Sequence, residues 1–303
     1  MVVERVRAAQ TEPPTGILTA EHELVVPSDA SPPIASRKNP LIRRITRLEK
    51  DPKLREEQGR YLLWGWKMAE EALRRPGDLE RLLIGAVLAR QAAGRALLRQ
   101  AAKLSIPVSL VDDRVLDEAA PGAGDQGILV LVKIRPANLE QMVEKRRDPV
   151  LLVTDRIQDP GNLGTLVRLA ETAGLAGVAV AAGTVDPYHS RAVRASAGSI
   201  LRVAVGRTGG ASELAPWCRM RGFRIAVSLP EGGVPCEQAD LRGSLALVVG
   251  NEGEGVGADW LDAADLRLTI RLAETTQSLN VSQAAAILLY EMIRQRRSER
   301  TSR

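Results

Sequence analysis

The chain has 303 residues, enough for two domains, and 45% of them are hydrophobic, so a sizeable core can form. Aromatic residues make up only 3%, which argues against RNA-binding folds that stack bases on a row of exposed rings. Two cysteines outside any CxxC spacing and two histidines nearly exclude a zinc site, so we expect no metal. No apolar run approaches about 18 residues and no signal peptide opens the chain, so we expect a cytoplasmic protein without membrane contact.

The formal net charge is +5, from 42 basic and 37 acidic residues, and this excess alone does not require a polyanionic partner. Its distribution is uneven. Nine basic and four acidic residues lie between Arg37 and Arg60, and the tail from Arg294 to Arg303 has five arginines and one glutamate. Both regions suit contact with phosphate, and a solvated basic surface explains them equally well.

Residues 1–36 contain five of the 17 prolines and little periodic pattern, so we predict a disordered leader. Residues 37–134 alternate between helical and strand patterns, which predicts a first α/β domain. A charged stretch follows, and we interpret residues 135–148 as a linker. The predicted elements of the first domain are helices over Leu41–Leu48, Lys67–Arg74 and Arg90–Lys103, a short apolar segment Tyr61–Trp64, and strands over Arg81–Ile84, Val108–Val111 and Ile128–Val132.

Residues 149–303 form a second α/β series of short apolar strands separated by helical segments. This rhythm predicts a mostly parallel sheet with helices on both faces. Ligands of such sheets bind at the carboxyl ends of the strands. The predicted strands are Val150–Thr154, Gly177–Ala181, Leu201–Val205, Phe223–Val227, Leu245–Gly250 and Leu266–Ile270.

The first informative segment follows the first of these strands and runs from Asp155 to Gly174. Asn162 is a predicted N-cap and Gly174 a predicted C′ residue of a helix. Arg168 lies off the apolar face of that helix. Taken alone, this pattern fits any strand–loop–helix unit.

The second segment, Leu245–Gly257, runs from five apolar residues into a glycine-rich turn. Such a turn allows positive φ angles and the close approach of a ligand to the backbone. No Lys-Ser/Thr pair follows, and Glu252 and Glu254 would repel a polyphosphate, so the turn is not a phosphate loop. An uncharged or cationic ligand suits it better.

The third segment has a strand, Leu266–Ile270, and then a final amphipathic helix. Three small polar residues, Ser278, Asn280 and Ser282, precede or begin this helix. Helix capping accounts for one of them. Three in five positions exceed what capping requires.

Together the three segments resemble the motifs of the SpoU family of RNA 2′-O-ribose methyltransferases, also called the TrmH family, within the SPOUT superfamily. The resemblance covers about Leu151 to Ile293 and rests on Asn-x₅-Arg, Gly-x-Glu-Gly-x-Gly and Ser-Leu-Asn-Val-Ser. The segment Asp186–Gly198 is similar to the stretch between motifs one and two. The first α/β block is similar to a substrate-binding domain like ribosomal protein L30e, through Asn39-Pro-Leu41, Lys67–Leu73 and Gln126–Val130, but has Leu63-Trp-Gly-Trp66 where the family often has a Val-Glu-Gly-type sequence.

The resemblance implies an α/β catalytic domain whose C-terminal part forms a deep trefoil knot, a rare exception to unknotted topology. It implies S-adenosylmethionine as cofactor and a homodimer with sites at the interface. Gly250, Ile270 and Leu279 match positions that bind the cofactor through the backbone. The residues that match active-site positions are Asn162, Arg168, Glu252, Ser278 and Asn280.

Models of this family assign Arg168 as the general base. A guanidinium holds its proton far above neutral pH, so we expect Arg168 instead to bind the neighbouring phosphate and to orient the 2′-oxygen. Asn162 is expected to hold Arg168 or the ribose, and Glu252 to anchor the loop or an arginine. Ser278 and Asn280 are expected to shape the cofactor pocket and to orient Arg168 or the target nucleotide.

The RNA substrate is left open. Ribosomal RNA, of the large subunit, is the first expectation and transfer RNA the second. A non-catalytic RNA-binding ribosome assembly factor of the same fold is the alternative of another class, and Arg168 and Asn280 count against it. Base methylation by another SPOUT branch is the nearest alternative among enzymes, and Ser-Leu-Asn-Val-Ser favours ribose.

Overall fold

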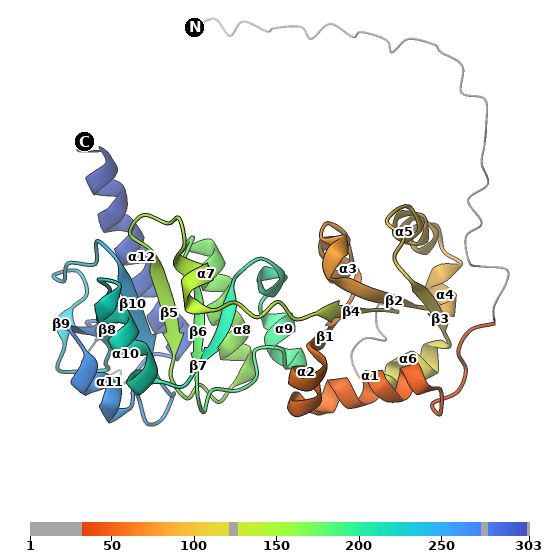
Figure 1. The fold of residues 1–303 in the computed structure, drawn as a ribbon, viewed down its shortest axis with the longest axis horizontal. Helices are drawn as coiled ribbons and strands as arrows, with labels where there is room; N and C mark the ends of the chain where they lie inside the picture. Colours follow the sequence, from red (N-terminus) through yellow and green to blue (C-terminus); the bar gives the residue numbers. More distant parts are fainter. Residues whose placement is uncertain (1–31, 121–126, 274–277, 302–303) are drawn as a thin grey trace, which may run out of the picture.

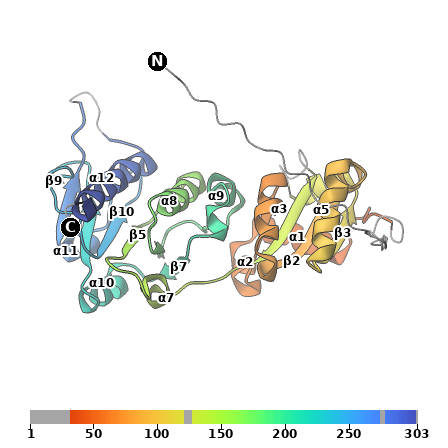
Figure 2. The ribbon, with the colours of Figure 1, turned by 90° about the horizontal axis from the view of Figure 1, so that it is seen from above.

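Two α/β domains lie side by side, and the computed structural model describes residues 32–120, 127–273 and 278–301 of the chain (Figure 1). The first domain has a four-stranded sheet in the order β1-β4-β2-β3, with β2 and β3 parallel and the other pairs antiparallel. Helices α3 and α5 cover one face of this sheet, and α1 lies on the other (Figure 2). Its elements are α1 (Pro40–Lys50), α2 (Pro52–Gln58), β1 (Arg60–Trp64), α3 (Trp66–Leu73), η1 (Pro76–Asp78), β2 (Leu79–Gly85), α4 (Ala86–Ala89), α5 (Ala92–Lys103), β3 (Val108–Val111), α6 (Asp113–Ala119) and β4 (Ile128–Lys133).

Helix α1 forms where the sequence predicts it, and its start shows why. The Asn39 side chain accepts a hydrogen bond from Leu41 N at 2.9 Å, and Pro40 occupies the first position, where its missing N–H has no partner to lose. At the other end Asp51 stops α1 and caps α2. The residues that α1 buries recur at helical spacing: Ile42, Ile45 and Leu48.

Two other features of the first domain bear on the predictions. Ile34 lies in the predicted leader, yet its backbone N–H donates to Leu110 O and its carbonyl oxygen accepts from Asp112 N. The chain therefore already pairs beside β3 at this residue. The rest of the predicted leader, residues 1–31, and Gln126 lie outside the described residues.

Trp64 is buried and Trp66 packs against the core, so both tryptophans serve packing.

The second domain has a seven-stranded sheet in the order β7-β6-β5-β10-β8-β11-β9, and all its strand pairs are parallel. Strands β5 and β10 are buried along their whole length. The prediction of a smaller α/β domain followed by a mostly parallel sheet is confirmed. The elements are β5 (Val150–Thr154), α8 (Pro160–Thr172), β6 (Gly177–Ala181), α9 (Ser190–Ala195), η3 (Ser199–Leu201), β7 (Val205–Thr208), α10 (Ala211–Met220), β8 (Arg224–Ser228), β9 (Val234–Pro235), β10 (Leu245–Val249), α11 (Ala258–Ala263), β11 (Leu266–Thr269) and α12 (Val281–Thr301).

The strand predicted over Leu201–Val205 is wrong in position. Ser199–Leu201 forms the 3-10 turn η3 after Gly198, whose φ of 91° suits glycine, and β7 begins only at Val205. Leu201 and Val203 pack instead against a core cluster that the two domains share. Their apolar side chains serve the domain interface rather than the sheet.

The segment predicted as a linker, 135–148, is packed on the second sheet. It contains α7 (Leu139–Val143), and Met142 on that helix is buried. A Cβ at Gly177 would lie 2.7 Å from the Met142 sulfur, and one at Gly206 would lie 2.0 Å from the Ala137 carbonyl oxygen. These two glycines on β6 and β7 leave the space into which the connecting segment fits.

The two domains meet through a buried ion pair. Arg55 on α2 donates to Asp186 at 2.6 Å, and the two side chains are only 3% and 8% exposed. Arg55 also donates to the carbonyl oxygens of Leu48 and Glu49, and Arg207 donates to the other Asp186 oxygen at 3.1 Å. Every charge in this cluster therefore has a partner.

Further contacts surround this pair. The Tyr61 and Tyr188 rings lie 4.9 Å apart, and burial raises the pKa of both hydroxyls. Arg202 contacts Glu71 of the first domain at 2.6 Å and Glu171 of the second at 2.9 Å. The interface thus combines aromatic packing with ion pairs, which holds the domains in one arrangement. In the described part of the chain, no helix is both long and apolar enough to cross a membrane.

Replacing Arg55 by methionine should lower the free energy of unfolding by about 3–5 kcal/mol, because Asp186 would stay buried with a weakened set of partners. Arg37→Met is the matched control, since Arg37 pairs with Glu118 on the surface, at 73% and 43% exposure, and such pairs contribute at most about 1 kcal/mol. Urea unfolding followed by circular dichroism measures both. Equal losses in the two variants would contradict a structural role of the buried pair.

Candidate active site

The three sequence segments converge at one edge of the large sheet. Strands β5, β8, β10 and β11 are parallel neighbours and end at this edge. Asp155 N donates to Val249 O at 2.9 Å, so the segment after β5 leaves the sheet beside the glycine-rich loop after β10. Residues 278–280, which precede α12, reach the same place: Ser278 and Leu279 line the cavity there, and Asn280 contacts Asn162.

A cavity of about 250 Å³ opens here, between the loops after β8, β10 and β11 and the start of α12. Five of the predicted site residues line it: Gly250, Ile270 and Leu279, predicted for the cofactor, together with Glu252 and Ser278. No lysine, arginine or histidine occurs among its described lining residues. The others are Ser228, Leu229, Pro230, Val249, Asn251, Gly253, Gly255, Leu272, Val281 and Ala284.

Asn162 connects all three segments. Its Nδ2 donates to Glu252 Oε1 at 2.7 Å, and its Oδ1 accepts from Asn280 Nδ2 at 3.1 Å. Asn280 Oδ1 in turn accepts from Ser282 N at 2.9 Å and so caps α12. The structure therefore brings Asn162, Glu252 and Asn280 together beside the cavity.

The prediction of Asn162 as N-cap is wrong, because α8 begins earlier. Asp159 is the cap, Pro160 takes the first helical position, and Asp159 Oδ1 accepts from Asn162 N at 2.9 Å. This backbone N–H, with Arg191 at 3.0 Å, holds the pKa of Asp159 below its usual value. Because Asp159 does the capping, the Asn162 side chain is available for Glu252 and Asn280. Gly174 ends the helix as predicted, with φ of 67°.

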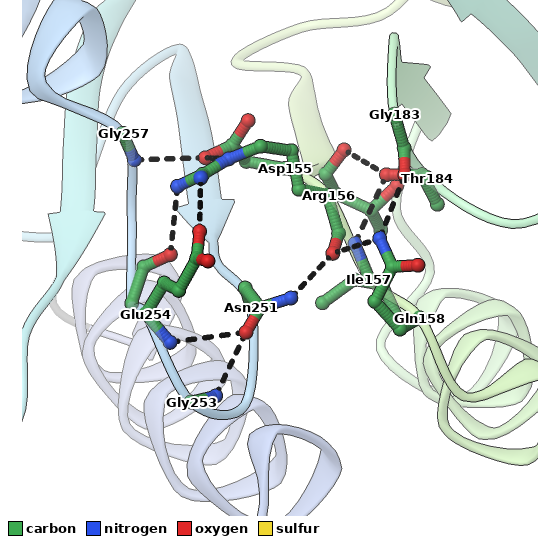
Figure 3. Close-up of polar contacts among 12 residues, drawn as sticks. Asp155, Arg156, Ile157, Gln158, Gly183, Thr184, Asn251, Gly253, Glu254 and Gly257 are labelled. Carbon is green, nitrogen blue, oxygen red and sulfur yellow. Dashed lines mark hydrogen bonds and ion pairs between the residues drawn. The ribbon is translucent and has the colours of Figure 1, made fainter.

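Arg156 fixes the other side of the glycine-rich loop (Figure 3). Its guanidinium contacts Glu254 at 2.6 Å, Gly255 O at 3.3 Å and Asp155 at 3.3 Å. Asp155 Oδ2 also accepts from Gly257 N at 2.8 Å. The two acidic residues of the loop thus point to different partners, Glu252 to Asn162 and Glu254 to Arg156.

The loop itself is closed tightly at Gly250. A Cβ on this residue would lie 2.5 Å from the backbone of Gly255 and from Val256 N, so only glycine fits. Asn251 pairs with Gly255 through backbone hydrogen bonds of 3.0 Å in both directions, and its side chain accepts from Gly253 N and Glu254 N. The turn is therefore shaped by contacts among its own residues.

Arg168 lies apart from these residues. Its side chain is exposed on α8, forms no ion pair within the described residues, and does not line the cavity. Arg168 is six positions after Asn162, which places the two side chains about 120° apart around the helix axis. The expected contact between Asn162 and Arg168 is therefore not formed within one chain.

Several residues of the site were not singled out from the sequence: Asp155, Arg156, Asn251 and the wall after β8. Asp155 and Arg156 directly follow the buried strand β5, and Ser228 ends β8. A polar residue right after a buried parallel strand is a usable signal, because such strand ends meet at one edge. Their partners are not readable, since the partners lie far away in the sequence.

Comparisons with known proteins agree with this geometry. The chain matches the model of the SpoU rRNA Methylase family over residues 149–290, and the model for RNA 2′-O ribose methyltransferase substrate binding over residues 62–137. It is 31% identical over 204 residues to the 23S rRNA (guanosine-2′-O-)-methyltransferase RlmB of Vibrio vulnificus, with 66% of this chain and 83% of that protein covered.

The 23S rRNA (guanosine(2553)-2′-O)-methyltransferase RlmP of Bacillus subtilis is 29% identical over 240 residues, which cover 79% of this chain and 91% of that protein. The crystal structure of the SpoU methyltransferase AviRb from Streptomyces viridochromogenes, in complex with AdoMet, superposes with a TM-score of 0.75 at 25% identity, covering 86% of this chain and 100% of that one. The chain belongs to the SpoU rRNA methylase family.

Proposed function

We propose that the protein transfers a methyl group from S-adenosylmethionine to a ribose 2′-hydroxyl of 23S ribosomal RNA. The observation that carries the proposal is the Asn162 bridge, which joins the three motif segments beside one cavity. Two relatives are named for this reaction, and a related structure contains AdoMet. Transfer RNA remains the second candidate substrate.

The cavity suits S-adenosylmethionine. Its described walls are glycine backbone, aliphatic side chains and the neutral polar side chains of Ser228, Asn251 and Ser278. Glu252 adds a carboxylate and no basic group is present in these described walls, so a cationic ligand fits and a polyphosphate does not. Gly250, Ile270 and Leu279 would hold it through their backbone groups. When bound, this cofactor supplies a methyl group already activated by its sulfonium.

The chain's own residues then position the acceptor. Asn162 and Asn280, locked to each other, form a polar edge at which the ribose would bind. Glu252 holds the glycine-rich loop to Asn162, and Ser278 closes the cavity wall. Arg168 binds the neighbouring phosphate, and the hydroxyl proton leaves through phosphate or water.

Arg168 would reach the reaction from a second copy of the chain. It lies exposed on α8, which packs against α12, and α12 exposes Ile287 and Tyr290 at 40% and 69%. A twofold dimer across these helices would cover both apolar side chains and bring Arg168 to the partner's cavity. The two free cysteines, both buried, fit the reducing cytoplasm in which we place the protein.

The experiment is transfer of tritiated methyl from S-adenosylmethionine to unmodified 23S rRNA and to total tRNA, followed by alkaline hydrolysis. Label in an alkali-resistant dinucleotide from 23S rRNA supports the proposal. Label in tRNA alone moves the substrate to that RNA. Label on a base contradicts ribose methylation, and no label from protein that binds the cofactor contradicts the enzymatic activity on these RNAs.

Gly250→Ala should weaken cofactor binding by about tenfold or more, because the added Cβ forces the loop open. Gly257→Ala is the control in the same loop, since its Cβ would meet only the Asp155 and Arg156 side chains, at 3.4 Å or more. Titration calorimetry with S-adenosylmethionine measures both. A folded Gly250→Ala protein with unchanged affinity would place the cofactor elsewhere.

Arg168→Lys should lower kcat/KM for RNA by about 10- to 100-fold at unchanged cofactor affinity, because lysine lacks the planar fork that matches a phosphate. Near-full turnover of Arg168→Lys at neutral pH would refute this role.

Mixing Arg168→Ala with Gly250→Ala tests the dimer. If Arg168 acts across the interface, subunit exchange at equal amounts should restore about a quarter of wild-type activity, since half of the dimers are mixed and each has one intact site. If Arg168 acts within its own chain, the mixture should show only the average of the activities that the two variants have alone.

A further inference from the structure

Helix α1 presents an unusual surface. Apart from Pro40, all its exposed residues are basic: Arg43, Arg47 and Lys50, at helical spacing of four and three residues. They lie opposite the buried Ile42, Ile45 and Leu48, and no ion pair neutralises them within the described part of the chain. Arg44, which faces the domain instead, is paired with Glu80 and Gln58. We call Arg43, Arg47 and Lys50 the α1 stripe.

Helix α1 lies on the side of the molecule at which the strands around the candidate site end (Figure 1). Strand β5 points to the lower edge in Figure 1, and α1 and α2 run along that same edge. The loop after β10 and the start of α8 are at the carboxyl end of β5 as well. A long polyanion bound at the site would therefore pass along α1.

The domain interface fixes the distance between the stripe and the site. Helix α2 follows α1 directly and carries Arg55, whose buried pair with Asp186 ties both helices to the catalytic domain. Arg55 also donates to the carbonyl oxygens of Leu48 and Glu49, the residues just before Lys50. The last turn of α1 is thus bound to the same cluster of charges as the catalytic domain.

We propose that the α1 stripe is a docking surface for the phosphate backbone of the substrate RNA, at a fixed distance from the methyl-transfer site. This inference rests on the proposed function and deepens it. The protein selects RNA whose fold presents phosphates to α1 while the target ribose enters the site, which requires a large folded RNA rather than a short strand around the target.

Helix α5 offers a matched comparison. Arg95, Arg99 and Lys103 give it the same charge, and they are also exposed. Helix α5 lies on the opposite face of the first sheet, away from the edge at which the site opens (Figures 1 and 2). The exposed surface of α5 also includes alanines and Gln100, so this surface, unlike that of α1, is only partly basic.

The test compares two triple variants of the full chain, Arg43→Gln/Arg47→Gln/Lys50→Gln and Arg95→Gln/Arg99→Gln/Lys103→Gln. Glutamine has a helix propensity close to that of arginine and lysine and removes the charge. Methyl transfer to unmodified 23S rRNA gives KM and kcat, and filter binding of the same RNA from low to high salt gives the salt slope. Thermal melting confirms that both variants are folded.

The α1 variant should raise KM for 23S rRNA by at least about tenfold with kcat within about twofold. It should also lower the salt slope by about 2 to 3, as expected for three lost phosphate contacts. The α5 variant should match the wild type. An α1 variant that equals the wild type, or an α5 variant that loses as much, overturns the inference.

The two proposals fail in different ways. If the wild type methylates no RNA, the proposed function fails, and the salt slope of binding alone still decides the role of α1. A short oligonucleotide around the target gives a second readout: wild type and α1 variant should share one high KM on it. A difference between them on this short RNA would contradict docking at a distance.

Discussion

The parallel pairing of β5 with β10 is the constraint on which the candidate site depends. Thr154 lies opposite Val249, and Asp155 N continues the ladder to Val249 O, so two strands far apart in sequence end at the same level. Short side chains can then cross between their loops. Asn162 reaches Glu252 and Arg156 reaches Glu254 because the backbone has already brought them within hydrogen-bond distance.

These two contacts act on opposite sides of one loop. Glycine at position 250 lets the turn close on itself, and the two carboxylates hold the closed turn to the segment after β5. The cavity wall is therefore held in place by contacts within the chain, and a wall held in this way limits the entropy lost on binding. Arg168 is the exception, since nothing in the described chain holds its side chain. This agrees with the proposal that Arg168 acts in the site of a second copy of the chain.

Polar contacts between segments far apart in the sequence also fix the two domains relative to each other. Charged groups are costly to bury unless they are paired, and Arg55 and Asp186 satisfy each other across the boundary. The segment 135–148, predicted as a linker, is packed through Met142. Both the domain interface and this covalent connection are therefore fixed by packing. Two domains in one fixed arrangement hold two RNA-binding surfaces at a constant spacing, so they can select an RNA whose groups have the matching spacing. Domains that move independently cannot.

Much of this was readable from the sequence: the order of the elements, the parallel sheet, and the residues around the cavity, because periodicity, glycines and motifs are local properties. The helix start at Asp159 and the place of β7 were missed, since an acidic cap three residues upstream and a shared domain core outweigh local pattern. Sequence placed Asn162, Glu252 and Asn280 in three separate motifs. Only the tertiary structure decided that one amide joins them while Arg168 stays outside, because partner choice depends on which strand ends are neighbours and on the direction each side chain takes around its helix.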